Sequence, residues 1–268
     1  MINLGKRNIL GVSVNAVDYE GAVQQIADAA REGRPLGVSA LAVHGVMTGV
    51  LDKTHRHRLN SLELVCPDGQ PVRWALNLLH KAKLRDRVYG PNLTLKTCER
   101  AAEDGLPVYL FGATEEILAA FEQNLCEKYP ALQVAGRRAS QFRTLSPEER
   151  DELVAEIKAS GAKITLVGIG CPRQEVWAYE MKDALSMPVL AVGAAFAFHA
   201  GLLDQAPSWM QDRGLEWFYR LTKEPTRLWK RYLYLNPLYA SLTAAQWLRL
   251  WRPKTDNTVE PTTPILYG

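Results

Sequence analysis

Cysteine is scarce in this 268-residue chain, and its four cysteines follow no pattern. Cys66, Cys98, Cys126 and Cys171 are widely spaced, with no Cys-x-x-Cys pair and no cysteine–histidine cluster. The sequence therefore indicates neither a disulfide framework nor a zinc motif, and we expect reduced thiols in a cytosolic compartment. With 47% hydrophobic and 23% charged residues, the composition is that of an ordinary globular protein.

Long apolar runs are also absent. The first residues lack the apolar stretch of a signal peptide. The longest uncharged run in the C-terminal part, residues 232–248, is 17 residues long and is interrupted by Asn236, Pro237 and Gln246. A membrane-spanning helix needs about 20 mainly apolar residues, so we expect a segment that lies in the membrane interface instead.

Two motifs of nucleotide chemistry are missing. No aspartates have the Asp-x-Asp spacing that commonly binds the metal ion of a nucleotide diphosphate, and the histidines show no metal-ligand spacing. We therefore expect no metal and no cofactor, with Arg side chains or helix dipoles neutralising phosphate charge. The Gly-x-Gly turn at residues 168–170 lacks the third glycine of the dinucleotide fingerprint, and an acidic ribose partner is missing. Both absences count against a nucleotide-dependent oxidoreductase, which is the alternative enzyme.

What the sequence does contain is a regular alternation of strand-like and helix-like segments. A hairpin is expected in residues 7–17, strands at 35–41, 62–66, 107–111, 132–136, 163–167 and 189–192, and helices at 19–31, 43–51, 54–59, 70–80, 92–103, 115–128, 146–159 and 173–185. This alternation predicts a Rossmann-like α/β fold, a mostly parallel sheet with helices on both faces. We divide the chain into a Rossmann-like domain, residues 1–200, and a C-terminal helical appendage with its tail, residues 201–268. The last part, 253–268, is expected to be loose.

The beginning of the appendage combines arginines with aromatic rings. Arg213, Arg220, Arg227 and Arg231 recur every seven, seven and four residues, which predicts one shared helix face. Between residues 213 and 252, eight Arg or Lys stand against two Glu, a net charge of +6, so the rest of the chain carries −3. Since Arg binds phosphate and Trp and Tyr suit a half-wet surface, we expect an anionic partner such as lipid headgroups. The alternatives are a solvated basic face, a fixed part of the core, or an oligomer interface.

Candidate ligand-binding residues follow the expected strands. In open α/β sheets, ligands bind beyond the carboxyl ends of the strands. The residues at these ends are Gly112 and Thr114, then Gly168, Gly170 and Gln174, then Asp68 in Pro67-Asp68-Gly69, and His44. Glycines let a phosphate approach the backbone at a helix N-terminus, and Asp68 has the position of a general base. Tight turns explain the glycines and the Asp-Gly pair equally well, and His44 is either polar lining of the cleft or a buried structural histidine.

Longer motifs occur in the second half of the chain. They are Gly168-x-Gly-x-Pro-x-Gln-Glu-x-Trp177, Gly193-Ala-Ala-Phe196, Ala206-Pro-x-Trp-Met210, and Gly214-Leu-Glu-Trp-x-Tyr-Arg-Leu221 with Glu224-Pro225 and Arg227-Leu228. With Pro67-Asp-Gly69 and Arg87-Val-x-Gly90, this pattern resembles the WecG/TagA/CpsF glycosyltransferases over about residues 8–235. The resemblance implies inverting, metal-independent transfer of a sugar from a UDP-sugar to a polyprenyl-diphosphate-linked sugar, in the synthesis of bacterial surface polysaccharide.

The resemblance also implies roles for individual residues. Asp68 matches the family's proposed catalytic base, and Gln174 matches a residue near the donor. Arg220, Arg227 and Arg231 match C-terminal arginines that close over the diphosphates. The partners implied are the UDP-sugar, the lipid-linked acceptor and a membrane surface contacted through the appendage; no nucleic acid is expected, and a homo-oligomer stays open. The location implied is peripheral, on the cytoplasmic face of the inner membrane.

The chain departs from the family pattern around the expected sugar pocket. Ala40-Leu41-Ala42 replaces Thr-x-Asn, Gly90-Pro91-Asn92-Leu93 replaces Gly-x-Asp-Leu, Phe196-Ala197-Phe198 replaces Phe-Asp-Phe, and Gln205-Ala206-Pro207 replaces Arg-Ala-Pro. The pattern is closer to the exopolysaccharide branch with its xanthan-type glucosyltransferase, which implies UDP-glucose or another UDP-hexose in place of UDP-N-acetylmannosamine. The alternative outside enzymology is a catalytically inactive, membrane-associated assembly factor, against which the retained Asp68 and Gln174 argue.

Overall fold

The computed structural model describes residues 1–268, apart from the side chains of Arg227, Lys230 and Arg231. Its strands are β1 (Asn3–Ile9), β2 (Val12–Val17), β3 (Leu36–Leu41), β4 (Leu64–Pro67), β5 (Val108–Gly112), β6 (Val134–Arg138), β7 (Ile164–Gly168) and β8 (Pro188–Ala191). Its helices are α1 (Tyr19–Glu32), α2 (Val43–Leu51), α3 (Lys53–Ser61), α4 (Gln70–His80), α5 (Gly90–Glu103), α6 (Glu115–Lys128), α7 (Pro147–Ala159), α8 (Arg173–Leu185), α9 (Ala195–His199), α10 (Ser208–Asp212), α11 (Glu216–Lys223) and α12 (Pro225–Trp247).

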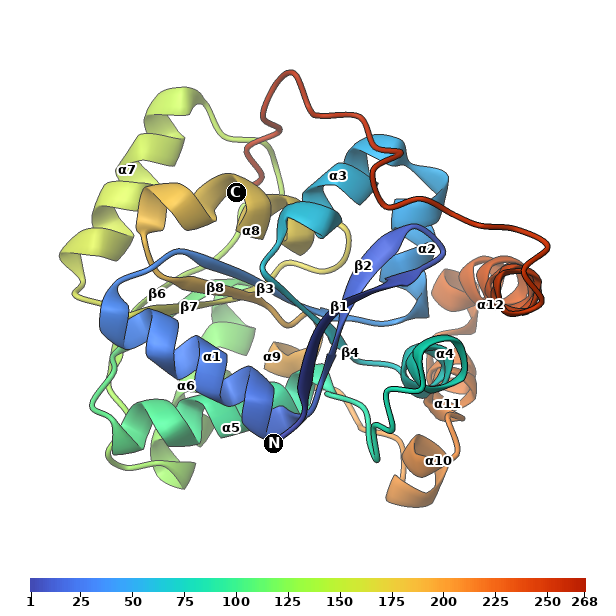
Figure 1. The fold of residues 1–268 in the computed structure, drawn as a ribbon. Coiled ribbons are helices and arrows are strands. Elements are labelled where there is room, and N and C mark those ends of the chain that lie inside the picture. Colours follow the sequence, from blue (N-terminus) through green and yellow to red (C-terminus); the bar gives the residue numbers. More distant parts are fainter.

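The predicted α/β fold is confirmed. β1 and β2 form an antiparallel hairpin, and the other six strands form a parallel sheet in the order β4-β3-β8-β7-β5-β6. In Figure 1, α1, α5 and α6 cover one face of this sheet, and α3, α7 and α8 cover the other. Most predicted elements differ from the observed ones by only one or two residues at each end; the hairpin begins four residues earlier, at Asn3.

Alternating side chains along the strands build a core on each face of the sheet. In β8, Val189 and Ala191 pack on the side of α8, whereas Leu190 packs on the side of α1 and α6. Successive strand residues point to opposite faces, so a strand that is apolar throughout supplies both cores. On one side, Trp177 stacks on Phe111 with ring centroids 4.7 Å apart. Because all six strands are parallel, their carboxyl ends meet at a single edge.

Local sequence signals explain the helix ends. Ser146 caps α7 by accepting from the N–H of Glu149, whose side chain accepts from the N–H of Ser146 in return, as the capping box predicts. Asp18 caps α1 by accepting from the N–H of Gly21, and Gly33 ends that helix with φ 62°. These caps pair backbone groups at the helix ends that would otherwise lack partners.

The C-terminal arginines do not share one helix, which corrects the prediction from their spacing. Gly214, with φ 70°, follows α10, and Pro225 begins α12, so the segment is divided into three helices. Arg213 lies at the end of α10, with its guanidinium 5.8 Å from the Trp209 ring, whereas Arg220 lies in α11. The seven-residue spacing of the arginines does not produce one continuous helix, because the glycine and the proline each interrupt the helical backbone.

Helix α12 lies along one side of the molecule, beside α4 and α11 in Figure 1. It also contacts α2. Its Tyr239 is 5% exposed and donates its hydroxyl to the carbonyl of Pro71 at 3.2 Å. At its far end, the amide of Gln246 donates to Asn8 and accepts from the N–H of Leu10. Of the helices described, none combines the length and hydropathy needed to cross a bilayer.

The tail after residue 252 is held against the body, in contrast to the loose segment expected. The Asn60 side chain donates to the carbonyl of Thr255 at 2.9 Å. The carboxylate of Glu180 accepts from the N–H groups of Ile265 and Leu266, both at 2.9 Å. The Pro- and Thr-rich composition did not predict that the tail is held in place, because its hydrogen bonds join tail backbone groups to side chains that are distant in the sequence.

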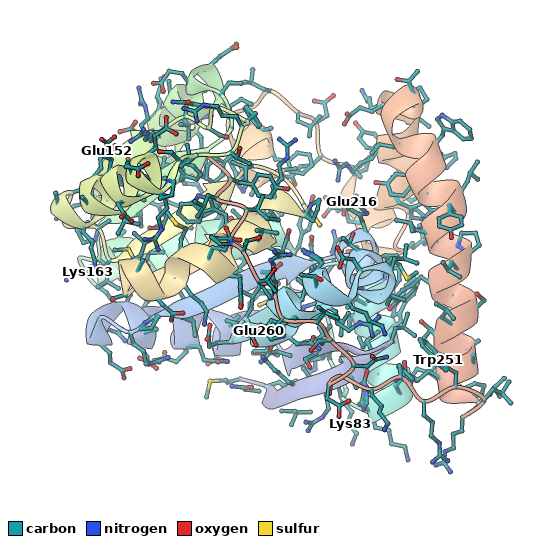
Figure 2. The ribbon with its side chains drawn as sticks, turned by 90° about the horizontal axis from the view of Figure 1, so that it is seen from above. Lys83, Glu152, Lys163, Glu216, Trp251 and Glu260 are labelled. Atoms are coloured by element: carbon teal, nitrogen blue, oxygen red, sulfur yellow. The ribbon has the colours of Figure 1, made fainter. Side chains whose placement is uncertain are left out.

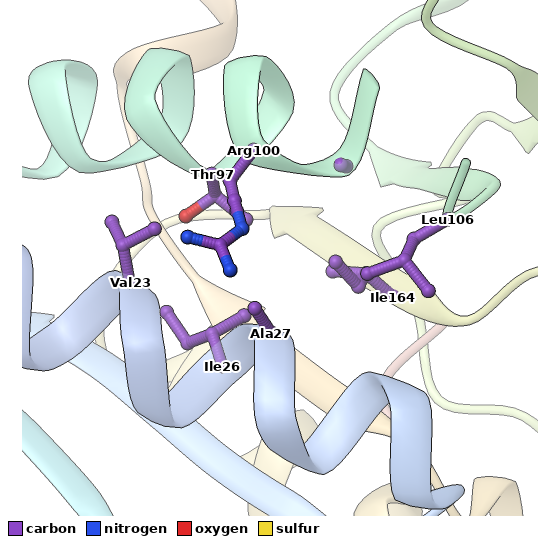
Figure 3. A pocket seen from close by; sticks show the side chains of 8 residues that line it. Val23, Ile26, Ala27, Thr97, Arg100, Leu106 and Ile164 are labelled. Atoms are coloured by element: carbon purple, nitrogen blue, oxygen red, sulfur yellow. The ribbon is translucent and has the colours of Figure 1, made fainter. Parts of the chain in front are cut away.

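Figure 3 shows a gap between α1 and α5. It is lined by Val23, Ile26, Ala27, Thr97, Arg100, Ala101, Leu106 and Ile164. Leu106 precedes β5 and Ile164 begins β7, which places the gap at the amino ends of the strands. It leaves no room for a water molecule and is a feature of packing.

Candidate active site

Asp68 directly follows β4, at the carboxyl edge of the sheet. Its N–H donates to the carbonyl of Leu41, the last residue of β3, at 3.2 Å, so two strand ends fix its backbone. Its Oδ1 accepts from the N–H of Gly90 at 3.1 Å. A Cβ at position 90 would lie 3.2 Å from Ala40 Cβ and 3.3 Å from the carbonyl oxygen of Val192. Glycine therefore lets this backbone N–H reach the carboxylate.

The surroundings of Asp68 make it more basic. Burial raises the pKa of Asp68 from 3.8 to about 7. The positive charge of Arg87 opposes this rise and the negative charge of Glu216 adds to it, while the Gly90 hydrogen bond and Arg220 lower the pKa. A general base works best when its pKa lies near the operating pH. A pKa of about 7 is compatible with a general base, and the catalytic role of Asp68 stays a prediction.

Arg87 connects the loop before α5 to the first turn of α11. Its Nη1 lies 2.7 Å from Oε2 of Glu216, and the two side chains are only 7% and 14% exposed. Its guanidinium lies 4.0 Å from the centre of the Tyr89 ring, and the Tyr89 hydroxyl donates to Oε1 of Glu216 at 3.0 Å. Its Nη2 donates to the side chain of Gln211 at 3.0 Å. The C-terminal helices therefore contact the segment that holds Asp68.

Gln174 and Glu175 form a buried pair at the start of α8. Nε2 of Gln174 donates to Oε1 of Glu175 at 2.9 Å, and the Ser39 hydroxyl donates to the same oxygen at 3.2 Å. This arrangement leaves Oε1 of Gln174 buried without a hydrogen-bond partner among the described residues. A Cβ on Gly193, which has φ 62°, would lie 3.4 Å from the Gln174 amide. The amide therefore lies against the turn after β8 with one unused acceptor atom, and the role of Gln174 near the donor stays a prediction.

The two glycines after β7 have different causes. A Cβ on Gly168 would lie 2.7 Å from the Phe196 ring, so the packing of α9 requires this glycine. Gly170 has φ 83° and open space where a Cβ would be, and its carbonyl accepts from the N–H of Gln174 at 3.0 Å. Of the two, only Gly170 leaves room for a ligand group at the N-terminus of α8.

The site predicted after β5 lies apart from Asp68. A Cβ on Gly112 would lie 2.6 Å from the Ile169 side chain, which accounts for this glycine by packing. Thr114 is exposed and caps α6, where its hydroxyl accepts from the N–H of Ile117 at 3.4 Å. Three strands separate β4 from β5, a span of about 19 Å at the usual strand spacing. The binding roles of Gly112 and Thr114 stay predictions.

The remaining candidates lie around the β3–β4 end of the sheet and on the C-terminal helices. His44 is the second residue of α2, directly beyond β3, and its side chain is half-buried. Arg220 lines a crevice with Phe198 and Asp204, and its Nε is buried without a hydrogen-bond partner among the described residues. Arg227 and Arg231 belong to α12, but their side chains lie outside the described part of the structure.

Three residues of the site had no predicted role: Arg87, Glu216 and Glu175. Arg87 lies in the Arg87-Val-x-Gly90 motif, and Glu216 lies in the Gly214-Leu-Glu-Trp-x-Tyr-Arg-Leu221 motif and counted as a negative charge in a basic segment. They are 129 positions apart in the sequence, so their contact depends on the tertiary fold. Among the described side chains, no group of three or more His, Cys, Asp or Glu is arranged to bind a metal ion.

Comparison with known families agrees with this geometry. The family model described as "Glycosyl transferase WecG/TagA/CpsF family" matches residues 7–253, which include the whole parallel sheet and the helices α1 to α12. The match does not distinguish the branches of the family, so the exopolysaccharide branch stays a prediction. The chain therefore belongs to the WecG/TagA/CpsF family of glycosyl transferases, and it is an enzyme that transfers a sugar.

Proposed function

We propose that this enzyme transfers a hexose, with inversion, from a UDP-sugar to a hydroxyl group of a polyprenyl-diphosphate-linked sugar. Membership in the family implies the UDP-sugar donor and the lipid-linked acceptor. The observation that supports the chemistry is Asp68, a carboxylate at the carboxyl edge of the sheet with a pKa of about 7. In this reaction, the acceptor oxygen bonds to the anomeric carbon, the bond to UDP breaks, and Asp68 takes the hydroxyl proton.

The leaving diphosphate requires positive charge. Arg220 is the C-terminal arginine whose side chain the structure describes near Asp68, since its charge lowers the pKa of that carboxyl group. Its Nε is buried without a hydrogen-bond partner among the described residues, and in this proposal a phosphate oxygen of the bound donor supplies the acceptor that it lacks. Arg227 and Arg231 carry further positive charge in α12. In this proposal, the arginines supply the electrostatic stabilisation that the departing UDP needs.

The donor is proposed to lie across the ends of β8 and β7, where Gln174 offers a hydrogen-bond acceptor. The buried Oε1 of Gln174 requires a donor group, such as a sugar hydroxyl or an imide N–H, and not a phosphate oxygen. The sugar is a UDP-glucose or UDP-N-acetylmannosamine type of hexose. Ala42 and Ala197 provide no polar side chain where many members have Asn and Asp.

The proposal is tested by a donor screen followed by a transfer assay. UDP-glucose, UDP-N-acetylmannosamine and related UDP-hexoses are added to the full-length protein, and the shift in melting temperature is measured. Each stabilising donor is then incubated with a short-chain polyprenyl-diphosphate sugar, and the product is analysed for mass and anomeric configuration. The expected product has one added hexose with inverted configuration; a retained configuration, or no transfer from any donor, would contradict the proposal.

The C-terminal helices are proposed to dock on the membrane, which would make the enzyme peripheral on the cytoplasmic face. Apolar side chains are exposed along α10, α11, α12 and just beyond: Trp209, Trp217, Phe218, Trp229, Leu233, Tyr234, Trp247, Leu248, Leu250 and Trp251. From Pro225 to Lys254 the sequence has six Arg or Lys and no Asp or Glu. Figure 2 shows α12 at the side of the molecule, with Trp251 near its C-terminal end. A basic helix with exposed apolar side chains is typical of interfacial binding.

Replacing exposed apolar residues of α12 should weaken binding to anionic vesicles. Leu233 is 64% exposed and Trp247 is 53% exposed. Each side chain contributes roughly 1.5–3 kcal/mol when fully buried, so Leu233→Ser with Trp247→Ser should reduce vesicle affinity by about tenfold or more. Cosedimentation with phosphatidylserine-containing vesicles measures it. The control is Leu78→Ala, since Leu78 is also exposed but lies on α4; equal affinities of all proteins would show that α12 is not the docking surface.

A further inference from the structure

The contact between Arg87 and Glu216 joins the α/β body to the C-terminal helices. In Figure 2, Glu216 lies between the body and α12. The ion pair is almost fully buried, and Glu216 also accepts from the Tyr89 hydroxyl. Arg87 also holds α10. Its guanidinium donates to the Gln211 side chain, and the amide of Gln211 donates in turn to the carbonyl of Ala206 at 2.7 Å. Residues 206–216 are thus fastened to the loop that contains Arg87 and Tyr89.

The loop that contains Arg87 and Tyr89 also fixes the position of Asp68. The N–H of Val88 donates to the carbonyl of Pro67 at 2.9 Å, and the N–H of Gly90 donates to the Asp68 carboxylate. The N–H of Tyr89 donates to the hydroxyl of Tyr19 on α1 at 2.9 Å. Residues 87–90 therefore lie between Asp68 and the C-terminal helices, and a change at Glu216 reaches Asp68 through four consecutive residues.

Opposite charges meet around the carboxylate. The charged groups that act on Asp68 are Arg87 from the loop, and Glu216 and Arg220 from α11. Tyr19, Tyr89 and Cys66 also face it, and the pKa of each of these groups is raised, mainly by burial, so all three are neutral near pH 7. The pKa of Arg87 is itself raised: burial opposes its charge, but Glu216 and Asp68 outweigh that effect. Arg87 is therefore a permanent cation with two possible carboxylate partners.

We propose that Glu216 is a positioning residue which, by pairing with Arg87, holds α10 and α11 over the strand ends and keeps Arg87 from neutralising Asp68. With the helices in place, Glu216 and Arg87 form a nearly neutral pair and Asp68 remains a strong base. When the helices move away, Asp68 becomes less buried and Arg87 loses Glu216, and both changes make Asp68 a weaker base. Arg220 leaves with the same helix and acts in the opposite direction, but its effect on Asp68 is smaller than those of burial, Arg87 and Glu216. The base is then fully active only when the C-terminal helices cover the site. This inference rests on the proposed role of Asp68.

The test is a pH titration of Asp68 in the full-length protein by NMR of aspartate side-chain carbons, with Asp68→Asn used to assign the resonance. Glu216→Gln should lower the pKa of Asp68 by about one pH unit, because the negative partner of Arg87 is removed. Arg87→Gln should raise it, because the positive charge is removed. A purely structural role for the pair would not move the titration in opposite directions. Asp212→Asn is the matched control, because Asp212 is exposed at the end of α10, and should leave the titration unchanged.

Two further measurements keep the test decisive if Arg87→Gln fails to fold. Tyr89→Phe keeps the ring against Arg87 but removes the hydroxyl that donates to Glu216, so it should lower the pKa of Asp68 by less than Glu216→Gln does. The second measurement is hydrogen exchange in residues 216–223. The exchange should become faster in Glu216→Gln and in Tyr89→Phe, and it should stay unchanged in Asp212→Asn.

The outcomes separate this inference from the proposed function. If Asp68 titrates at the same pH in the wild type, Glu216→Gln and Tyr89→Phe, the inference is overturned even if the enzyme transfers sugar. If the titration shifts as expected but no UDP-sugar is used, the role of the ion pair stands and the proposed function fails. Where transfer is measured, the acid limb of the kcat/KM profile should move in the same direction as the titration.

Discussion

Asp68→Asn should reduce the turnover number by about 10²–10⁴-fold, the usual contribution of general base catalysis. Asparagine keeps the carbonyl oxygen that accepts from Gly90 N–H, so the loop should keep its position. What it loses is the ability to accept the proton of the acceptor hydroxyl. We therefore expect nearly unchanged binding of the UDP-sugar and a large loss in kcat, measured in the transfer assay at pH 8.

The pH dependence provides a second check on the same variant. The base must be deprotonated, so wild-type kcat/KM should fall as the pH drops through about 7, and the residual activity of Asp68→Asn should lack this limb. Asp86→Asn is the matched control, because Asp86 accepts from Gln70 and from the N–H of Arg87 but takes no proton in the proposed reaction. Near-normal turnover of Asp68→Asn would remove Asp68 from the mechanism.

The raised pKa also predicts a change in stability. The native state holds the Asp68 proton up to a pH of about 7, whereas the ordinary pKa is 3.8. Between these values the native state binds more protons than the unfolded state, so the free energy of unfolding falls as the pH rises. Above pH 7 Asp68 is charged in both states, and the full penalty of burying its charge is present. At roughly 1.4 kcal/mol per pKa unit, the penalty is a few kcal/mol at most. Asp68→Asn should therefore raise the melting temperature more at pH 8 than at pH 5.

Arg220→Ala should reduce kcat by about 10²–10³-fold, as expected when one preorganised donor to a developing negative charge is removed. The loss should not arise from unfolding. The buried Nε of Arg220 has no hydrogen-bond partner among the described residues, so its removal leaves no described acceptor unpaired. Combining Arg220→Ala with Arg227→Ala should abolish measurable transfer, while binding to anionic vesicles remains.

The control for this prediction is Arg213→Ala. Arg213 is exposed at the end of α10, beside the ring of Trp209. Its replacement by alanine removes an equal charge from the same region. It should retain nearly normal kcat. Product inhibition by UDP measures the phosphate contact directly, and the inhibition constant should rise in Arg220→Ala but not in Arg213→Ala. Normal transfer by the Arg220→Ala, Arg227→Ala protein would show that these arginines do not act on the diphosphate.

The sequence by itself determined the elements of the body and their class. Alternating apolar strands and helices with readable ends, such as the capping box at Ser146 and the glycine after α1, predict a parallel sheet. Because parallel strands place their carboxyl ends at one edge, the position of Asp68 at this edge followed from the order of segments. These features depend on residues close together in the chain.

The tertiary structure decided everything that depends on distant residues. The seven-residue spacing of arginines predicted one helix, but Gly214 and Pro225 divide the segment, and α11 is placed by Glu216 against Arg87. The tail from residue 253 is ordered because Asn60 and Glu180 bind its backbone. The pKa of Asp68 likewise comes from burial and from charges in a loop and a helix far apart in sequence. Burial and long-range pairing are properties of the packed chain, and no local pattern encodes them.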